Sequence, residues 1–165
     1  MKPAALIALA LLLVPGVTLA RGPAPQRIPT VWEWIYAAIA AADNNVQTIE
    51  IMVACLTETG LKRPPVKRGK SGERGICQVT ERTAAPVSKG GVGCKPGWDE
   101  HGHYLTPATA DCAARVLARV SRECPTPDEM QYAYNIGNCR DFWINDHVER
   151  SQGWRTWLKK LMENK

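Results

Sequence analysis

Ser71-Gly-Glu-Arg-Gly-Ile-Cys-Gln-Val-Thr80 is the stretch of this chain on which the prediction of its fold depends. Two glycines three residues apart precede an apolar triplet that Gln78 interrupts. Alternation of apolar and polar residues after a glycine pair predicts a short strand that follows a tight turn. An amide in such a strand has no obvious place in a core, which raises the question of what Gln78 faces.

Helical patterns lie on both sides of this stretch. Thr30 is placed to cap a helix with one apolar face, formed by Trp32, Ile35, Tyr36 and Ile39. A second apolar helix is predicted over 46–59, with Gly60 as its C-cap. Prolines begin two more, over 107–122 and 127–137, and weaker patterns predict helices over 141–150 and 154–162. The fold class predicted is mostly α, as one compact helical domain with one small strand element.

Length and charge set the class of partner. The 165 residues suffice for one domain, and the formal net charge is +5. A modest positive excess suits a polyanionic partner such as a cell wall or an anionic membrane. Nucleic acid is not expected as a partner, because the sequence has no basic run, zinc spacing or stacking motif.

The first twenty residues predict export. One lysine precedes an apolar core, Pro15 and Gly16 break it, and Thr18-Leu19-Ala20 supplies the small residues that a signal peptidase requires. The alternative is a weak N-terminal anchor, with only transient membrane contact through residues 3–20, since 18 residues span about 27 Å as a helix. Residues 21–29 are rich in proline and glycine and predict a linker before a domain over 30–165.

Six cysteines follow the export segment, an even number that predicts up to three disulfides in a periplasmic or extracellular protein. No Cys-x-x-Cys pair occurs, so zinc and thioredoxin chemistry are not expected. His101 and His103 could hold a metal, but they lack a third nearby ligand of known geometry, so an exposed loop without a metal is expected.

Glu58 is the candidate acid. It falls in the last turn of a strongly apolar predicted helix, where the helix dipole disfavours a negative charge. Partly apolar surroundings should also raise the pKa of this carboxyl. A carboxyl that stays protonated near neutral pH can act as a general acid, whereas the simpler reading is an exposed glutamate at a helix end.

Three blocks of sequence resemble the soluble lytic transglycosylase family. They are Glu58-Thr59, then Gly72-Glu-Arg-Gly-Ile-Cys-Gln-Val-Thr-Glu-Arg-Thr-Ala84, then Ala133-Tyr-Asn-Ile-Gly137. The family pattern is Glu-Ser at a helix end, Gly-Ala-x-Gly-Leu-Met-Gln-Ile-x-Pro-x-Thr-Ala, and Ala-Tyr-Asn-x-Gly. The order and the ungapped spacing are kept over about 46–137. The resemblance implies a goose-lysozyme-like α+β fold.

The resemblance also implies a chemistry. Glu58 would protonate the glycosidic oxygen between N-acetylmuramic acid and N-acetylglucosamine in peptidoglycan, and then act as base to form a 1,6-anhydro product. Substrate-binding positions would be Thr59, Gln78, Tyr134 and Asn135, with the strand element lining the groove and the tyrosine hydroxyl reaching toward the acid. The resemblance implies that no metal or cofactor is needed, and the chain is expected to be a monomer. A minimal domain without a separate wall-binding repeat favours wall opening for secretion or conjugation, or lysis by a phage endolysin.

The departures from the pattern leave alternatives open. Thr59 replaces serine, and Glu73 replaces alanine, which adds a second carboxylate beside Glu58. An outward, solvated Glu73 is the general expectation for a glutamate. A Glu73 that faces the groove could place a water, and the protein would then be a muramidase, a hydrolase. A third alternative is an inactive module for wall binding or morphogenesis.

Two arguments predict the pairing of the cysteines. If the helices over 107–122 and 127–137 pack antiparallel, Cys112 and Cys139 are equally far from the turn between them and should pair. Cys124 and Cys139 should not pair, because the helix between them spans ~15 Å, beyond the ~7 Å that a disulfide can bridge. Cys55 and Cys77 flank the implied groove and form a second predicted pair. Cys94 and Cys124 remain as the third.

Overall fold

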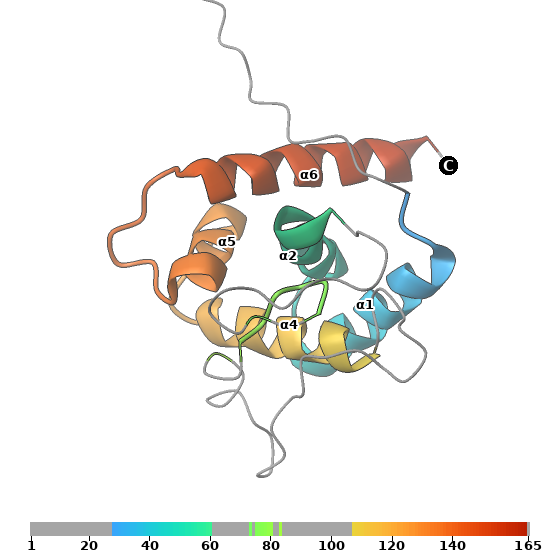
Figure 1. Ribbon diagram of the computed structural model, residues 1–165, viewed down its shortest axis with the longest axis horizontal. Helices are drawn as coiled ribbons and strands as arrows, with labels where there is room; N and C mark the ends of the chain where they lie inside the picture. The colour runs from blue at the N-terminus through green and yellow to red at the C-terminus, as the bar shows by residue number, and fades with distance from the viewer. Residues whose placement is uncertain (1–27, 61–72, 74, 81–82, 84–106, 165) are drawn as a thin grey trace, which may run out of the picture.

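The structure is a computed structural model that describes residues 28–60, 73, 75–80, 83 and 107–164. Its described part is mostly helical, which confirms the coarse prediction (Figure 1). The predicted signal segment and nearly all of the predicted linker lie outside the described residues, as do His101, His103 and Cys94. Within the described ranges, no helix is long and apolar enough to cross a membrane. The helices are α1 (Val31–Asn44), α2 (Thr48–Thr59), α4 (Pro107–Val120), α5 (Pro127–Ile136) and α6 (Asp146–Glu163).

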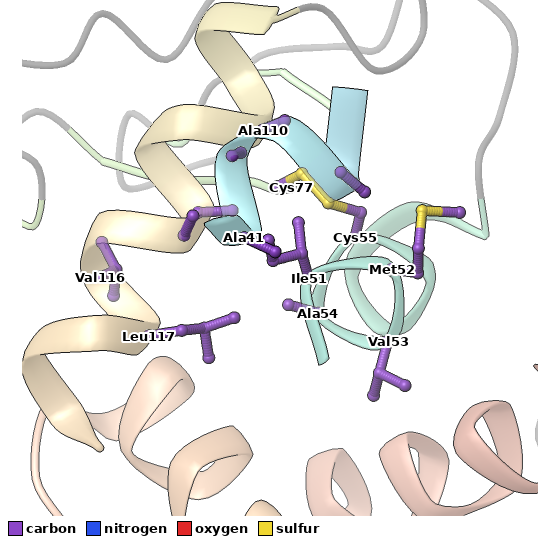
Figure 2. Packing of buried hydrophobic residues seen from close by; sticks show 14 of the residues in the cluster. Ala41, Ile51, Met52, Val53, Ala54, Cys55, Cys77, Ala110, Val116 and Leu117 are labelled. Atoms are coloured by element: carbon purple, nitrogen blue, oxygen red, sulfur yellow. A yellow bond between two sulfur atoms is a disulfide. The ribbon is translucent and has the colours of Figure 1, made fainter. Parts of the chain in front are cut away.

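Helix α2 is the centre of the molecule and contacts each of the other four helices (Figure 1). Its sequence explains this position, since apolar residues occupy every side of the helix from Ile51 to Leu56 and all of them are buried. Figure 2 shows the side chains of α2 packing against Ala41 of α1 and against Ala110, Val116 and Leu117 of α4. The helix that ends in Glu58 is therefore held by the core along its whole length.

Local caps fix where the helices begin. Thr30 and Glu33 form a reciprocal capping box at the start of α1, in which the backbone N–H of Thr30 donates to the Glu33 carboxylate at 2.6 Å. Thr126 and Glu129 repeat the arrangement at the start of α5. Gly60 ends α2 in the left-handed region with φ of 61°, a conformation that costs glycine little.

The apolar face predicted for α1, formed by Trp32, Ile35, Tyr36 and Ile39, is largely exposed rather than buried in the core. Alanines bury α1 against α2 and α4, and these small side chains let the helices approach closely. Several larger apolar residues lie on the outside, where Trp32 is 62% exposed and Ile39 is 56% exposed, whereas Tyr36 is partly buried against the core. Helical periodicity alone could not choose between the two faces, because both are apolar.

The prediction of two helices over 141–150 and 154–162 is wrong, because the single helix α6 covers most of both ranges. A single helix runs through Gly153, and residues 141–145 precede it as a loop with Asn145 as N-cap. Glycine costs an α-helix interior about 1 kcal/mol relative to alanine. Burial of Ser151, Trp154 and Leu158 along one side of α6 outweighs that cost.

The predicted strand over 76–79 is a turn in the structure. Residues 75–78 form the turn, and only Val79 makes an isolated β-bridge. Gln78 has a φ of 48°, and a residue in that left-handed region cannot continue an extended strand. Hydrophobic alternation over so few residues fits a buried turn as well as a strand.

The disulfides confirm one predicted pair and overturn the other two. Cys55 and Cys77 are bonded, as Figure 2 shows. Cys124 is bonded to Cys139, so the predicted Cys112–Cys139 and Cys94–Cys124 pairs are wrong. Cys112 is also disulfide-bonded. Two or more bridges are typical of a protein that folds in an oxidising, exported environment.

The error over Cys139 came from equating helix length with the separation of the cysteines. The Cα atoms of Cys124 and Cys139 are 6.0 Å apart although α5 lies between them in sequence. Gly137, with φ of 102°, reverses the chain after α5. The hydroxyl of Tyr132 then donates to the carbonyl of Asp141 at 3.2 Å, so the following residues run back along the helix. This return brings Cys139 beside Cys124.

A buried ionic network joins α2, α5 and α6. Glu50 is 1% exposed and accepts hydrogen bonds from Arg155 Nε at 2.7 Å and Arg155 Nη2 at 3.0 Å. Arg155 Nη1 donates to Asp128 at 2.7 Å, and the amide of Gln131 donates to Glu50 at 3.0 Å. Each charge has a partner of opposite sign, which offsets the cost of removing it from water.

Candidate functional site

The described residues enclose a cavity of about 110 Å³ at the C-terminal end of α2. Three separate parts of the chain form its wall: the end of α2, the described residues 73, 78–80 and 83, and the last turn of α5. All three predicted sequence blocks therefore contribute to one cavity. Its lining residues are Glu58, Glu73, Gln78, Val79, Thr80, Thr83, Tyr134 and Asn135.

Glu58 is a carboxyl in this cavity with strongly altered acidity. Its side chain is 22% exposed, and burial raises the pKa of the carboxyl from 4.5 to about 7. The charge of Arg150 acts in the opposite direction, and the charge of Glu73 adds a smaller upward contribution. Glu58 is thus protonated in an appreciable fraction of molecules at neutral pH, as a general acid must be.

One disulfide and two hydrogen bonds hold the turn at residues 75–79 against Glu58 and its neighbours. The Cys55–Cys77 bond joins it to α2 one turn before Glu58. The hydroxyl of Thr59 donates to the carbonyl of Ile76 at 2.7 Å. From α5, the hydroxyl of Tyr134 donates to the carbonyl of Cys77 at 2.8 Å. The turn is therefore fixed by both helices that border the cavity.

Gln78 is ordered by its own turn. Its side-chain N–H donates to the carbonyl of Gly75, and its backbone N–H donates to the same carbonyl at 3.3 Å. The φ of 48° is uncommon for a residue with a side chain, and such conformations concentrate at functional sites. The amide presented to the cavity is thus held by the protein rather than free to rotate.

The other predicted site residues divide into two groups. Asn135 and Glu73 line the cavity, so the expectation of an outward Glu73 is wrong. Thr59 does not line it; its buried hydroxyl is used within the protein. Tyr134 lines the cavity with its ring, but its hydroxyl is bonded to Cys77 rather than to Glu58. Burial first, and the charge of Glu58 second, raise the pKa of this phenol.

Four polar residues at or near the site were missed by the sequence analysis as site residues. Thr80 and Thr83 line the cavity and bond to each other, with 2.8 Å between their hydroxyl oxygens. Arg150 and His147 come from the first turns of α6, and His147 Nδ1 lies 3.7 Å from Glu58 Oε1. Only Thr83 had a signal, as a matched position in the second block. Nothing local marks the α6 residues, because only tertiary packing brings them to Glu58.

Because Gln78 has a left-handed backbone, its replacement by glycine is expected to be less destabilising than its replacement by alanine. This is the reverse of the usual order for these two residues. Gln78→Gly relieves a backbone strain of about 1–2 kcal/mol, whereas Gln78→Ala keeps that strain, and both lose the hydrogen bond to Gly75. The glycine variant should therefore unfold at higher urea concentration than the alanine variant, even though glycine gains more entropy on unfolding. Equilibrium denaturation measures this difference. An alanine variant that is the more stable by the usual margin would show that position 78 is not left-handed.

Searches against protein-family models, curated proteins and solved structures found no match to this chain. The resemblance to soluble lytic transglycosylases therefore depends on the three short blocks. Their meeting in one cavity is a separate, structural observation.

Proposed function

We propose that this chain is a lytic transglycosylase that cleaves the glycan strand of peptidoglycan between N-acetylmuramic acid and N-acetylglucosamine. The observation that carries the proposal is Glu58, a carboxyl with a pKa raised to about 7 in a cavity that all three motif blocks line. A central helix that ends in an acid, beside a turn that presents Gln78, suits the lysozyme-like fold that the motifs imply.

The proposed reaction uses one carboxyl twice. Glu58 donates its proton to the glycosidic oxygen, and the bond from that oxygen to C1 breaks through an oxocarbenium-like transition state. The Glu58 carboxylate then accepts the proton of the 6-hydroxyl of the muramic acid residue. That oxygen attacks C1 and closes the 1,6-anhydro ring, which leaves Glu58 protonated again. A group with a pKa near 7 suits both halves of this reaction.

A second candidate, a muramidase, is favoured by one observation. Glu73 lines the same cavity as Glu58, and its negative charge contributes to the raised pKa of the acid. Two carboxyl groups about one cavity are the usual equipment of a hydrolase, in which the second places or activates a water. Water would then attack C1 in place of the 6-hydroxyl.

Digestion of purified sacculi, with mass spectrometry of the soluble muropeptides, tests both candidates. Products that lack the mass of one water and resist borohydride reduction are anhydro products and support the transglycosylase. Reducible products support the muramidase, and Glu73→Gln should then abolish their formation. Binding to sacculi without release of any muropeptide contradicts both and supports the inactive wall-binding module.

The setting that we propose is local wall opening or lysis outside the cytoplasm. The disulfides support an exported protein, and a positive net charge suits the anionic cell wall. Peptidoglycan strands are the proposed partner.

The pKa of Glu58 predicts a pH profile. The free enzyme needs protonated Glu58, so kcat/KM should fall as pH rises through about 7. Glu73→Gln removes a charge that raises this pKa and should move the fall to lower pH, whereas Arg150→Gln should move it to higher pH. Initial rates on sacculi between pH 5 and 9 measure the three profiles. Shifts in the same direction for both variants would contradict the assignment of the fall to Glu58.

The Cys55–Cys77 and Cys124–Cys139 disulfides allow a matched comparison of their effects on stability and activity. Each closes a short loop, over sequence separations of 22 and 15 residues, so each should contribute about 2–4 kcal/mol to the free energy of unfolding. Of these two disulfides, only Cys55–Cys77 joins the turn at 75–79 to α2. The Cys55→Ser/Cys77→Ser double variant should therefore lose muropeptide release below its thermal midpoint. The Cys124→Ser/Cys139→Ser variant, equally destabilised, should keep it, and equal losses of activity would contradict the tie.

A further inference from the structure

His147 is placed against the proposed acid by the start of α6. It is 4% exposed, and its Nδ1 atom lies 3.7 Å from Oε1 of Glu58. The two residues are far apart in the sequence and belong to helices that pack directly on each other. The ring therefore reaches Glu58 from α6, whereas the turn at 75–79 belongs to the segment that follows α2 in the sequence.

Hydrogen bonds fix the backbone of His147 relative to α2. The hydroxyl of Ser151 donates to the carbonyl of His147 at 2.9 Å and lies 3.0 Å from the hydroxyl of Thr57. Thr57 is the residue before Glu58, and its single hydroxyl proton is shared between the hydroxyl of Ser151 and the carbonyl of Val53, which lies 2.8 Å away. This short chain of bonds connects the turn of α6 that carries the imidazole to the turn of α2 that carries the acid.

The imidazole of His147 is uncharged at neutral pH, and its Nδ1 atom faces Glu58. Burial, followed by the charge of Arg150, lowers the pKa of His147 to about 4. The Nε2 atom is buried and has no hydrogen-bond partner. A neutral imidazole carries a single proton, and Nδ1 is the nitrogen that faces an acceptor. The Nδ1–H tautomer directs that proton to Glu58.

We propose that His147 is a positioning residue for Glu58, whose Nδ1–H orients the carboxyl and donates a hydrogen bond to it when it becomes a carboxylate. The proposal depends on the proposed function for its catalytic meaning. The separation of 3.7 Å exceeds a hydrogen bond, and such contacts at catalytic sites commonly shorten when substrate binds. No proton leaves His147 in the reaction; its N–H stabilises the negative charge on Glu58 between the two proton transfers.

The charges around the pair come from each neighbouring element. Glu73 on the segment after α2 disfavours the Glu58 carboxylate, and Arg150 on α6 favours it. Tyr134 on α5 stays a neutral phenol, because burial and the charge of Glu58 raise its pKa. Arg150 is exposed to solvent, whereas the ring of His147 is buried with its Nδ1 atom 3.7 Å from Glu58 Oε1.

The first test needs no substrate. Nitrogen-15 NMR of the histidines at pH 8, with the His147 signal assigned by its absence from His147→Asn, reports which ring nitrogen holds the proton. We expect the Nδ1–H tautomer. The Nε2–H tautomer would overturn the proposal, because Nδ1 would then have no proton to give to Glu58.

The second test compares an apolar and an amide replacement. Carbon-13 titration of the Glu58 carboxyl should give a pKa that is higher by about 0.5 or more in His147→Leu, because the carboxylate loses a donor. Asparagine can offer an N–H close to the position of Nδ1–H, so His147→Asn should return the pKa toward that of the wild type. On sacculi, kcat should fall about tenfold to a hundredfold in the leucine variant, with KM nearly unchanged and with recovery in the asparagine variant.

The outcomes separate this proposal from the proposed function. A Glu58 pKa that is the same in the wild type and both folded variants overturns the role of His147, whatever the activity. If only the leucine variant fails to fold, the tautomer measurement and the asparagine variant decide the matter. A wild-type protein that releases no muropeptides contradicts the proposed function, whereas the titrations still test the contact between His147 and Glu58.

Discussion

Glu58→Gln is expected to reduce muropeptide release from sacculi by about 10³-fold or more while the fold is kept. The amide has nearly the shape of the carboxyl but can neither donate the proton to the glycosidic oxygen nor accept one from the 6-hydroxyl. The same cavity, turn and disulfide remain around it. Retention of even a tenth of the wild-type turnover would remove Glu58 from the mechanism.

The stability of this variant provides its internal control. A carboxyl whose pKa is raised by folding contributes stability below its unfolded value of 4.5, and that contribution is lost as pH rises through about 7. At pH 8 the neutral amide should therefore leave the protein at least as stable as the wild type. Glu123→Gln, an exposed glutamate away from the cavity, should change neither activity nor stability.

Arg155→Leu is expected to cost about 3–5 kcal/mol of the free energy of unfolding. The substitution leaves Glu50, which is almost fully buried, with only the amide of Gln131 as a side-chain donor. It also removes one of the two side-chain hydrogen bonds from α6 to Asp128 of α5, of which the bond from Gln152 remains. Urea denaturation at pH 7 measures the loss, and a cost below about 1 kcal/mol would mean that the network contributes little.

Two further variants test whether burial of the Glu50 charge causes the loss of stability. Asp111→Asn breaks an i,i+4 pair with Arg115 in which the carboxylate is 30% exposed, and it should cost only about 0.5 kcal/mol. The double variant Glu50→Leu/Arg155→Leu removes both charges and should recover part of the loss of the single variant, since apolar replacements of buried pairs are often tolerated.

The features predicted correctly from the sequence are those fixed by local interactions. Thr30 caps α1, Gly60 ends α2 and Gly137 ends α5, each through contacts within a few residues. Glu58 falls in the last turn of a buried helix for the same reason. These helix ends and the position of the candidate acid could therefore be predicted from the printed sequence.

The features predicted wrongly depend on packing between distant segments. The face of α1 was chosen by close approach of alanines to other helices, and α6 continues through Gly153 because its neighbours are buried. The Cys124–Cys139 bond depends on the path of the chain after α5. His147 reaches Glu58 only through the packing of α6 on α2, which no short sequence pattern encodes.

The bond between Cys55 and Cys77 makes chemical maturation a condition of assembling the candidate site. A newly made chain in a reducing cytosol has the acid on α2 but lacks the covalent link to the turn that presents Gln78. We expect formation of that link in an oxidising environment to complete the candidate site. Material produced in a reducing host should therefore be oxidised before it is assayed, because an inactive reduced sample would say nothing about the chemistry of Glu58.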